Sequence, residues 1–252
     1  MHMKKNKTAL IVTVVIIFLI TLIAISLLIN GDENVNVNVP VSSISSNIEI
    51  PVVNTLLSEE ERLEVAEEMK QTFENKIDKT VLKVNGEEIS EKEIALIDFQ
   101  RNNQYVNKDG EKIDAVDEAI KQYVILQDAE KNNITLTEEQ EKDIKARMEK
   151  SIQNSTEEET KALLDAFKMT QEEFIEFYVD RTKKLEIISK WSYTISNKIN
   201  NGELKIEDEE FNNRYQEYQK SEEPSTRVKL LLELVEMYEN YLMEQATVEY
   251  IN

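Results

Sequence analysis

The sequence predicts a mainly α-helical fold, and composition, capping signals and apolar spacing all favour it. The 252 residues include only 4 Gly and 3 Pro, so few helix breakers interrupt the chain. A Ser or Thr followed three residues later by Glu or Gln marks a helix start, and this pattern recurs at Ser58, Ser90, Thr137 and Thr170. After each position, apolar residues return at spacings of three and four, as on one helix face.

The composition also excludes several kinds of function. The net charge is −20, from 30 Lys and Arg against 50 Asp and Glu, so a nucleic-acid backbone would be repelled. There is no Cys, and the single His is His2. The body of the chain therefore offers no disulfide, no thiolate nucleophile, no Ser-His or Cys-His pair and no His-based metal site. We expect no cofactor, no small-molecule substrate and no nucleic-acid partner.

The N-terminus predicts a membrane anchor. Residues 8–29 carry no charge and would span roughly 33 Å as a helix, enough for the hydrocarbon core of a bilayer. A cleaved signal peptide is the alternative, but its apolar region is usually shorter, and apolar residues here continue past the small-residue site at 24–26. Lys4, Lys5 and Lys7 precede the span, which places residues 1–7 in the cytoplasm.

The rest of the chain then lies outside the membrane, as suits a bacterial cell surface, and we expect a Gram-positive one. Residues 30–57 contain Asn-Val repeats, serines and two prolines without helical spacing, which favours a flexible stalk. Residues 58–252 are predicted to fold as one helical domain. Its first helix starts at Ser58 and places apolar residues on one face as far as Phe73 and Ile77.

A short run of β-formers, residues 81–84, interrupts the helices. It is followed by the Asn85-Gly86 turn signal and then by the helix that Ser90 caps. Further helices are predicted at 115–132, from Thr137 through Ile152, at 157–167, from Thr170 to about Ile199, at 204–220 and at 227–245, and 221–226 interrupts the last two. The chain ends in alternating β-formers, residues 246–252.

The ordered series of these segments resembles the SurA/PrsA group of extracytoplasmic chaperones. The stretch "VLKVNGEEISEKEI" resembles the strand, turn and capped helix that open the chaperone domain of that group. The following helices resemble the family's second and third helices and its long helix, as far as about residue 200. Arg227 to Asn252 resembles the helix and strand that return to the chaperone domain.

The chain departs from the family at one place. A parvulin-type peptidyl-prolyl isomerase module usually lies between the long helix and the returning helix, but here only "QKSEEPST" separates the flanking segments. Parvulin sites rely on histidines and a cysteine or aspartate, and His and Cys are lacking beyond His2. The resemblance therefore implies a chaperone domain without the isomerase. In such a domain, we predict a two-stranded pairing of residues 81–84 with 248–251.

The function implied is a holdase that binds unfolded or newly secreted polypeptides, here called clients, without enzyme activity. Binding many sequences calls for partly exposed, adaptable apolar side chains. The candidates are Met148, Phe167, Met169, Phe177 and Tyr178. Ordinary helix core is the alternative for each of them. A structural or adaptor protein that uses the same scaffold for one fixed partner is the alternative function.

The acidic runs raise the question of calcium. An EF-hand loop needs Gly at position six, and counting back from Gly110 places Tyr105 at position one, which excludes that match. Acidic residues at helix starts interact favourably with the helix dipole, so solvated helix starts explain the runs. No metal site is expected.

Overall fold

The computed structural model describes residues 59–73, 76, 79–102 and 112–251. The tail at 1–7, the anchor at 8–29, the stalk at 30–57 and the Ser58 cap lie outside the described residues. Among the helices that the structure describes, none is long and apolar enough to cross a membrane.

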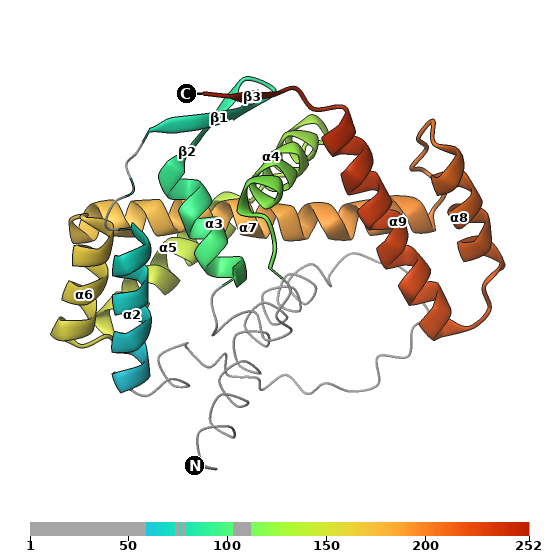
Figure 1. The fold of residues 1–252 in the computed structure, drawn as a ribbon. Helices are drawn as coiled ribbons and strands as arrows, with labels where there is room; N and C mark the ends of the chain where they lie inside the picture. The colour runs from blue at the N-terminus through green and yellow to red at the C-terminus, as the bar shows by residue number, and fades with distance from the viewer. Residues whose placement is uncertain (1–58, 74–75, 77–78, 103–111, 252) are drawn as a thin grey trace, which may run out of the picture. The chain divides into compact units, whose positions relative to one another are not determined.

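The described chain is mainly helical, as predicted, with one small sheet (Figure 1). Its helices are α2 (Glu59–Phe73), α3 (Glu91–Asn102), α4 (Ala115–Lys131), α5 (Glu138–Gln153), α6 (Glu157–Phe167), α7 (Gln171–Asn200), α8 (Glu209–Lys220) and α9 (Pro224–Glu244). Its strands are β1 (Thr80–Val84), β2 (Glu87–Ser90) and β3 (Val248–Tyr250).

Three of the predicted helix caps are present in the structure, and those at Thr137 and Thr170 are complete capping boxes. The Glu93 amide donates to Ser90 Oγ, the Gln140 amide to Thr137 Oγ1 and the Glu173 amide to Thr170 Oγ1, at 3.2–3.3 Å. A further capping box, which was not predicted, joins Thr156 and Glu159 at the start of α6. Because a cap depends on residues only three apart, these helix starts could be read locally.

The predicted break before the last helix is shorter than expected. Pro224 occupies the first turn of α9, so the helix starts there instead of at Arg227. Proline is well tolerated at this position, because its missing N–H would have no partner within the helix. Only residues 221–223 separate α8 from α9.

The predicted strand pairing is confirmed, but the sheet has three strands instead of two. β1 lies between β2 and β3 and is antiparallel to both. Leu82, Lys83 and Val84 face Tyr250, Glu249 and Val248, and the Ile251 amide donates to the Val81 carbonyl at 3.0 Å. The C-terminal strand thus returns to a strand near residue 80, as Figure 1 shows.

The third strand, β2, follows from the Asn85-Gly86 turn. Both residues have positive φ, 52° and 89°, as the two central positions of a type I′ hairpin require. Asn85 also binds the C-terminal segment. The backbone amide of Asn85 donates to the Thr247 carbonyl, and the backbone amide of Thr247 donates to Asn85 Oδ1, both at 2.8 Å. The turn residue therefore joins the hairpin to β3.

The chain divides into two compact units. Among the described residues, the first unit contains 59–73, 99–102, 112 and 142–180, and the second contains 76, 79–98, 113–141 and 181–251. From the sequence, residues 58–252 were expected to form a single domain without such a boundary.

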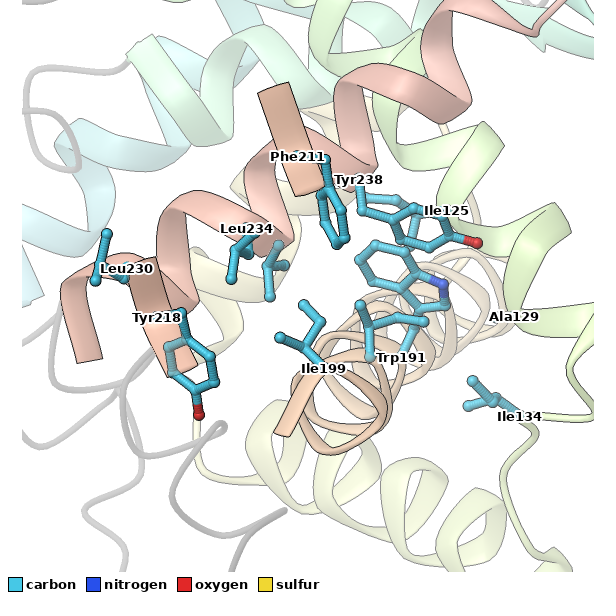
Figure 2. Close-up of a cluster of buried hydrophobic side chains, with 12 residues drawn as sticks. Ile125, Ala129, Ile134, Trp191, Ile199, Phe211, Tyr218, Leu230, Leu234 and Tyr238 are labelled. Carbon is cyan, nitrogen blue, oxygen red and sulfur yellow. The ribbon is translucent and has the colours of Figure 1, made fainter. Parts of the chain in front are cut away.

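The second unit has two apolar clusters. One lies against the sheet and is formed by Leu82, Val84, Ile89, Ile97, Ala119, Ile120, Tyr123 and Val124. The other, shown in Figure 2, joins α4, α7, α8 and α9. At its centre Trp191, with 0% exposure, stacks on Tyr238 with ring centroids 5.9 Å apart and planes at 8°. The Trp191 indole N–H donates to Asp128 Oδ2 at 2.7 Å, so the buried carboxylate has a partner.

Candidate functional site

Five aromatic rings gather in the first unit, and they include three of the five predicted client-binding residues. This aromatic cluster consists of Phe73, Phe167, Phe174, Phe177 and Tyr178. The Phe167 ring lies 4.5 Å from that of Phe73, 5.3 Å from Phe174 and 5.6 Å from Phe177, measured between centroids. Phe174 and Tyr178 are 5.4 Å apart. Such tilted arrangements are favourable for aromatic rings beyond the area they bury.

The local sequence explains why α6 and α7 bring these rings together. Lys168 ends α6 in the left-handed conformation, with φ 52°, and the Met169 amide donates to the Leu164 carbonyl. The Thr170 capping box then starts α7 almost at once. Phe174, Phe177 and Tyr178 stand three and four residues apart on one face of α7, and that face meets Phe167.

The cluster has an enclosed part and a partly open part. Phe73, Phe167 and Phe174 are buried, with exposures of 1%, 0% and 2%. Phe177 and Tyr178 are only partly buried. Phe167 is therefore enclosed beneath the partly open rings, as the alternative of ordinary helix core describes. Helix spacing identifies an apolar face but not the helix that covers it.

The two predicted methionines are partly buried, Met148 on α5 and Met169 in the connection between α6 and α7. The ring contacts of the aromatic cluster join Phe167, Phe177 and Tyr178 and do not involve either methionine. Phe73 was placed on an apolar helix face by the sequence, and neither Phe73 nor Phe174 was named as a site residue. Their position next to Phe167 in space could not be read from spacing alone.

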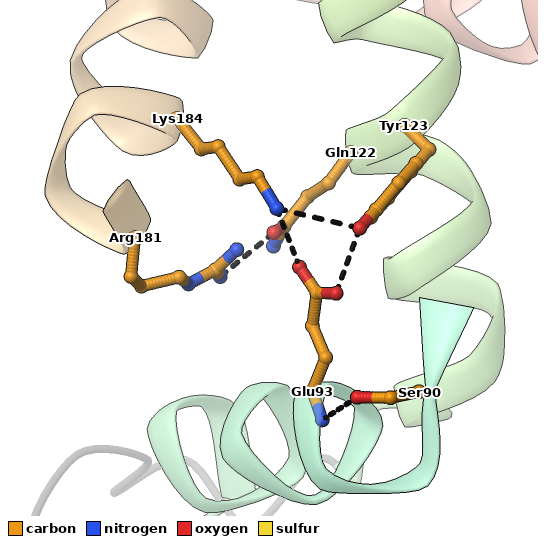
Figure 3. Close-up of polar contacts among 6 residues, drawn as sticks. All are labelled: Ser90, Glu93, Gln122, Tyr123, Arg181 and Lys184. Carbon is orange, nitrogen blue, oxygen red and sulfur yellow. Dashed lines mark hydrogen bonds and ion pairs between the residues drawn. The ribbon is translucent and has the colours of Figure 1, made fainter. Parts of the chain in front are cut away.

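A polar network in the second unit links α3, α4 and α7 (Figure 3). Glu93, on α3, accepts a hydrogen bond from the Tyr123 hydroxyl at 2.7 Å and forms an ion pair with Lys184 Nζ at 3.1 Å. Lys184 also lies 5.3 Å from the centroid of the Tyr123 ring. Ser90 holds the backbone of Glu93 through its helix cap. The Glu93 residue is thus held at its carboxylate by Tyr123 and Lys184 and at its backbone by Ser90.

Beside it lies a buried chain of side chains on α4 and α7. Arg181 is 4% exposed and donates to Gln122 Oε1 at 2.7 Å. Gln122 in turn donates to Glu118 Oε1 at 2.8 Å. Two residues after Arg181, Lys183 pairs with Glu141 at the start of α5 at 2.5 Å. Because buried charges require such partners, the network fixes how α7 packs in the second unit.

Two buried tyrosines give the protein a pH dependence at the alkaline end. Burial, followed by the charge of Glu93 and its hydrogen bond, raises the pKa of Tyr123. Burial, followed by the charge of Asp128 and its hydrogen bond, raises the pKa of Tyr238. In an unfolded chain both phenols would ionise near pH 10.

We therefore expect these tyrosines to make a constant contribution to the free energy of unfolding below about pH 10, and we expect this contribution to fall above that pH. Above that pH the unfolded chain releases protons that the folded chain keeps, so the free energy of unfolding falls by up to about 1.4 kcal/mol per pH unit for each tyrosine. Urea denaturation between about pH 8 and 11 measures this slope. Tyr123→Phe should remove about half of it, and an unchanged slope in that variant would contradict the assignment.

A shallow pocket of about 530 Å³ lies between α8 and α9. Its lining includes Arg214, Lys220 and Lys229 with Glu217 and Glu233. Arg214 pairs with both glutamates, at 2.8 and 3.3 Å. Within the described residues no group of three or more His, Asp or Glu could hold a metal ion.

Comparisons with known proteins add no family assignment. Neither protein-family models, nor curated proteins, nor solved structures give a match to this chain. The features that bear on function are therefore the fold and the surfaces of the chain itself.

Proposed function

We propose that this protein is a membrane-anchored extracytoplasmic holdase of SurA/PrsA type that lacks the isomerase module. Its clients are unfolded or newly secreted polypeptides. The N-terminus stays in the cytoplasm, residues 8–29 cross the membrane, and the helical part holds clients near the outer face of the cell membrane, in a Gram-positive bacterium.

The observation that carries the proposal is the closure of the second unit by β3. The C-terminal strand pairs with β1, as the resemblance implies for a chaperone domain, and only residues 221–223 join α8 to α9 where the isomerase would be inserted. The pairing of β3 with β1 closes the second unit although only residues 221–223 connect α8 to α9, so this closure does not depend on an inserted isomerase module.

The partly open rings of Phe177 and Tyr178 supply the client-binding surface. They rest on enclosed rings, so their orientation is supported from beneath while their outer edges remain accessible. Rigid aromatic side chains lose little conformational entropy on binding and can stack against many kinds of apolar residue. The net charge of −20 helps to keep a client complex in solution.

The test is suppression of aggregation by the full-length chain in nanodiscs, with three unrelated denatured clients. We expect suppression of all three, and a loss of about 5- to 30-fold in apparent affinity when Phe177→Ala and Tyr178→Ala are combined, since each truncated aromatic contact is worth about 1 kcal/mol. Tyr193→Ala is the matched control: it removes an aromatic ring from the same helix, at a position 39% exposed in the second unit.

The result also separates the alternative functions. Failure with every client, together with one tight partner, would favour the adaptor function and overturn the holdase. A proline-isomerisation assay on the same samples should give no rate above background. Thermal unfolding of each variant checks that any loss of suppression occurs in a folded protein.

A further inference from the structure

The charge pattern of α9 differs from that of helices α3 to α8. Each of the helices α3 to α8 carries Asp or Glu in its first turn. α9 has no acidic residue in its first turn and no basic residue in its last. Arg227 and Lys229 lie in its first half, and its glutamates, Glu233, Glu236, Glu239 and Glu244, lie further along the helix. Acidic charge is present at the N-terminus only outside the helix, at the N-cap Glu223, and within the helix the charges run against the helix dipole.

Contacts within the chain compensate part of this charge. Glu233 pairs with Arg214, Glu239 pairs with Lys121, and the Arg227 guanidinium lies 4.9 Å from the centroid of the Tyr218 ring. Lys229 approaches Glu233 at 3.8 Å, but its side chain remains 78% exposed. Lys229 and Glu236 thus remain turned toward solvent on the outer side of α9.

Two large apolar side chains share this exposed side of α9 with Lys229 and Glu236. Val228 is 58% exposed and Leu232 is 64% exposed. Val228, Leu232 and Glu236 stand four residues apart and share one side of the helix, with Lys229 beside Val228. This outer face of α9, defined by Val228, Lys229, Leu232 and Glu236, has Val228 and the basic Lys229 at one end, Leu232 in the middle and the acidic Glu236 at the other end.

We infer that the outer face of α9 binds the same face of a second copy of this chain, in an antiparallel arrangement. A twofold axis at Leu232 places Leu232 against Leu232 of the second copy. It also places Lys229 of each copy beside Glu236 of the other, because positions roughly equally far before and after the axis face each other. Antiparallel packing sets the two helix dipoles in opposite directions, and the reversed charges become complementary.

The size of this face predicts a weak dimer. A stable interface usually involves about 20–30 residues on each partner, whereas the outer face of α9 is defined by four. The dimer should therefore exchange rapidly and be found most clearly by covalent capture. The inference does not depend on client binding, since α9 belongs to the second unit and the aromatic cluster to the first.

The absence of cysteine from the sequence makes a site-specific test possible. Leu232→Cys and Val228→Cys are prepared in the full-length chain in mild detergent and treated with a mild oxidant. In the antiparallel dimer the two thiols introduced at position 232 meet at the axis, whereas the two positions 228 lie roughly 12 Å apart along the helices. We expect disulfide-linked dimers to form at least about tenfold faster from Leu232→Cys, although both positions are similarly exposed.

Charge reversal supplies the second arm. On the Leu232→Cys background, Lys229→Glu or Glu236→Lys alone should reduce the cross-linking rate about tenfold, because two attractive pairs become repulsive. The double variant Lys229→Glu with Glu236→Lys should restore it. Equal cross-linking at 228 and 232, or a double variant that stays as slow as the single ones, would overturn the dimer and leave this face to a different partner.

Discussion

Trp191→Ala should destabilise the protein by about 3–5 kcal/mol, the largest single effect that we expect from the described core. Trp191 is fully buried, stacks on Tyr238 and donates its indole N–H to Asp128. Truncation removes a large apolar side chain, leaves a cavity in a region where four helices meet, and takes a donor from a buried carboxylate. The free energy of unfolding is measured by urea denaturation, followed by circular dichroism because this is the single Trp.

The control for this change is Tyr193→Ala, two residues further along α7. Tyr193 is 39% exposed, so its loss should cost less than about 1 kcal/mol. Asp128→Asn tests the polar part separately, because the amide oxygen can still accept one hydrogen bond while the charge is removed. A Trp191→Ala variant as stable as Tyr193→Ala would show that α7 does not pack against α4 and α9 as described.

Local signals account for the parts of the fold that the sequence predicted well. Ser90, Thr137 and Thr170 each cap a helix through a partner three residues away, so no knowledge of the tertiary fold was needed. β2 was missed because its four residues include two glutamates and only one buried apolar residue, Ile89. Its pairing comes from the Asn85-Gly86 turn, which directs the chain back along β1 whatever the composition of the second strand.

The candidate site shows where sequence reasoning stops. Phe167 and Phe177 look alike in an apolar stripe, and only the packing of α2 against α6 buries the first and leaves the second partly open. Likewise Arg181 and Glu118 occur among many charged residues, and their spacing does not distinguish them from a solvated face. Their burial depends on the packing of α4 against α7. In that contact Gln122 and Arg181, which are 59 residues apart in the sequence, form a hydrogen bond.

In contrast to these contacts, the pairing of β1 with β3 was predicted from the sequence, although the two β-prone segments lie far apart in the chain. The hydrogen bonds of Thr247 and Ile251 to β1 and its turn show which backbone groups of the C-terminal segment face inward. Backbone groups alternate along a strand, so the amide of Tyr250 points to the outer edge of the sheet. A proline scan can therefore separate the pairing from the side chains.

Removal of residues 247–252 should destabilise the second unit by about 3 kcal/mol. The truncation removes the hydrogen bonds of Thr247 and Ile251 and the ladder at Glu249, each worth about 1 kcal/mol net. Ile251→Pro should lose one of these bonds and cost about 1–2 kcal/mol, whereas Tyr250→Pro, whose amide faces the outer edge, should cost under about 0.5 kcal/mol. Urea denaturation gives the energies, and amide hydrogen exchange at Leu82 to Asn85 should accelerate in the truncated chain. Equal costs for the two proline variants would mean that β3 is not held by this register, and the closure that supports the chaperone proposal would fail with it.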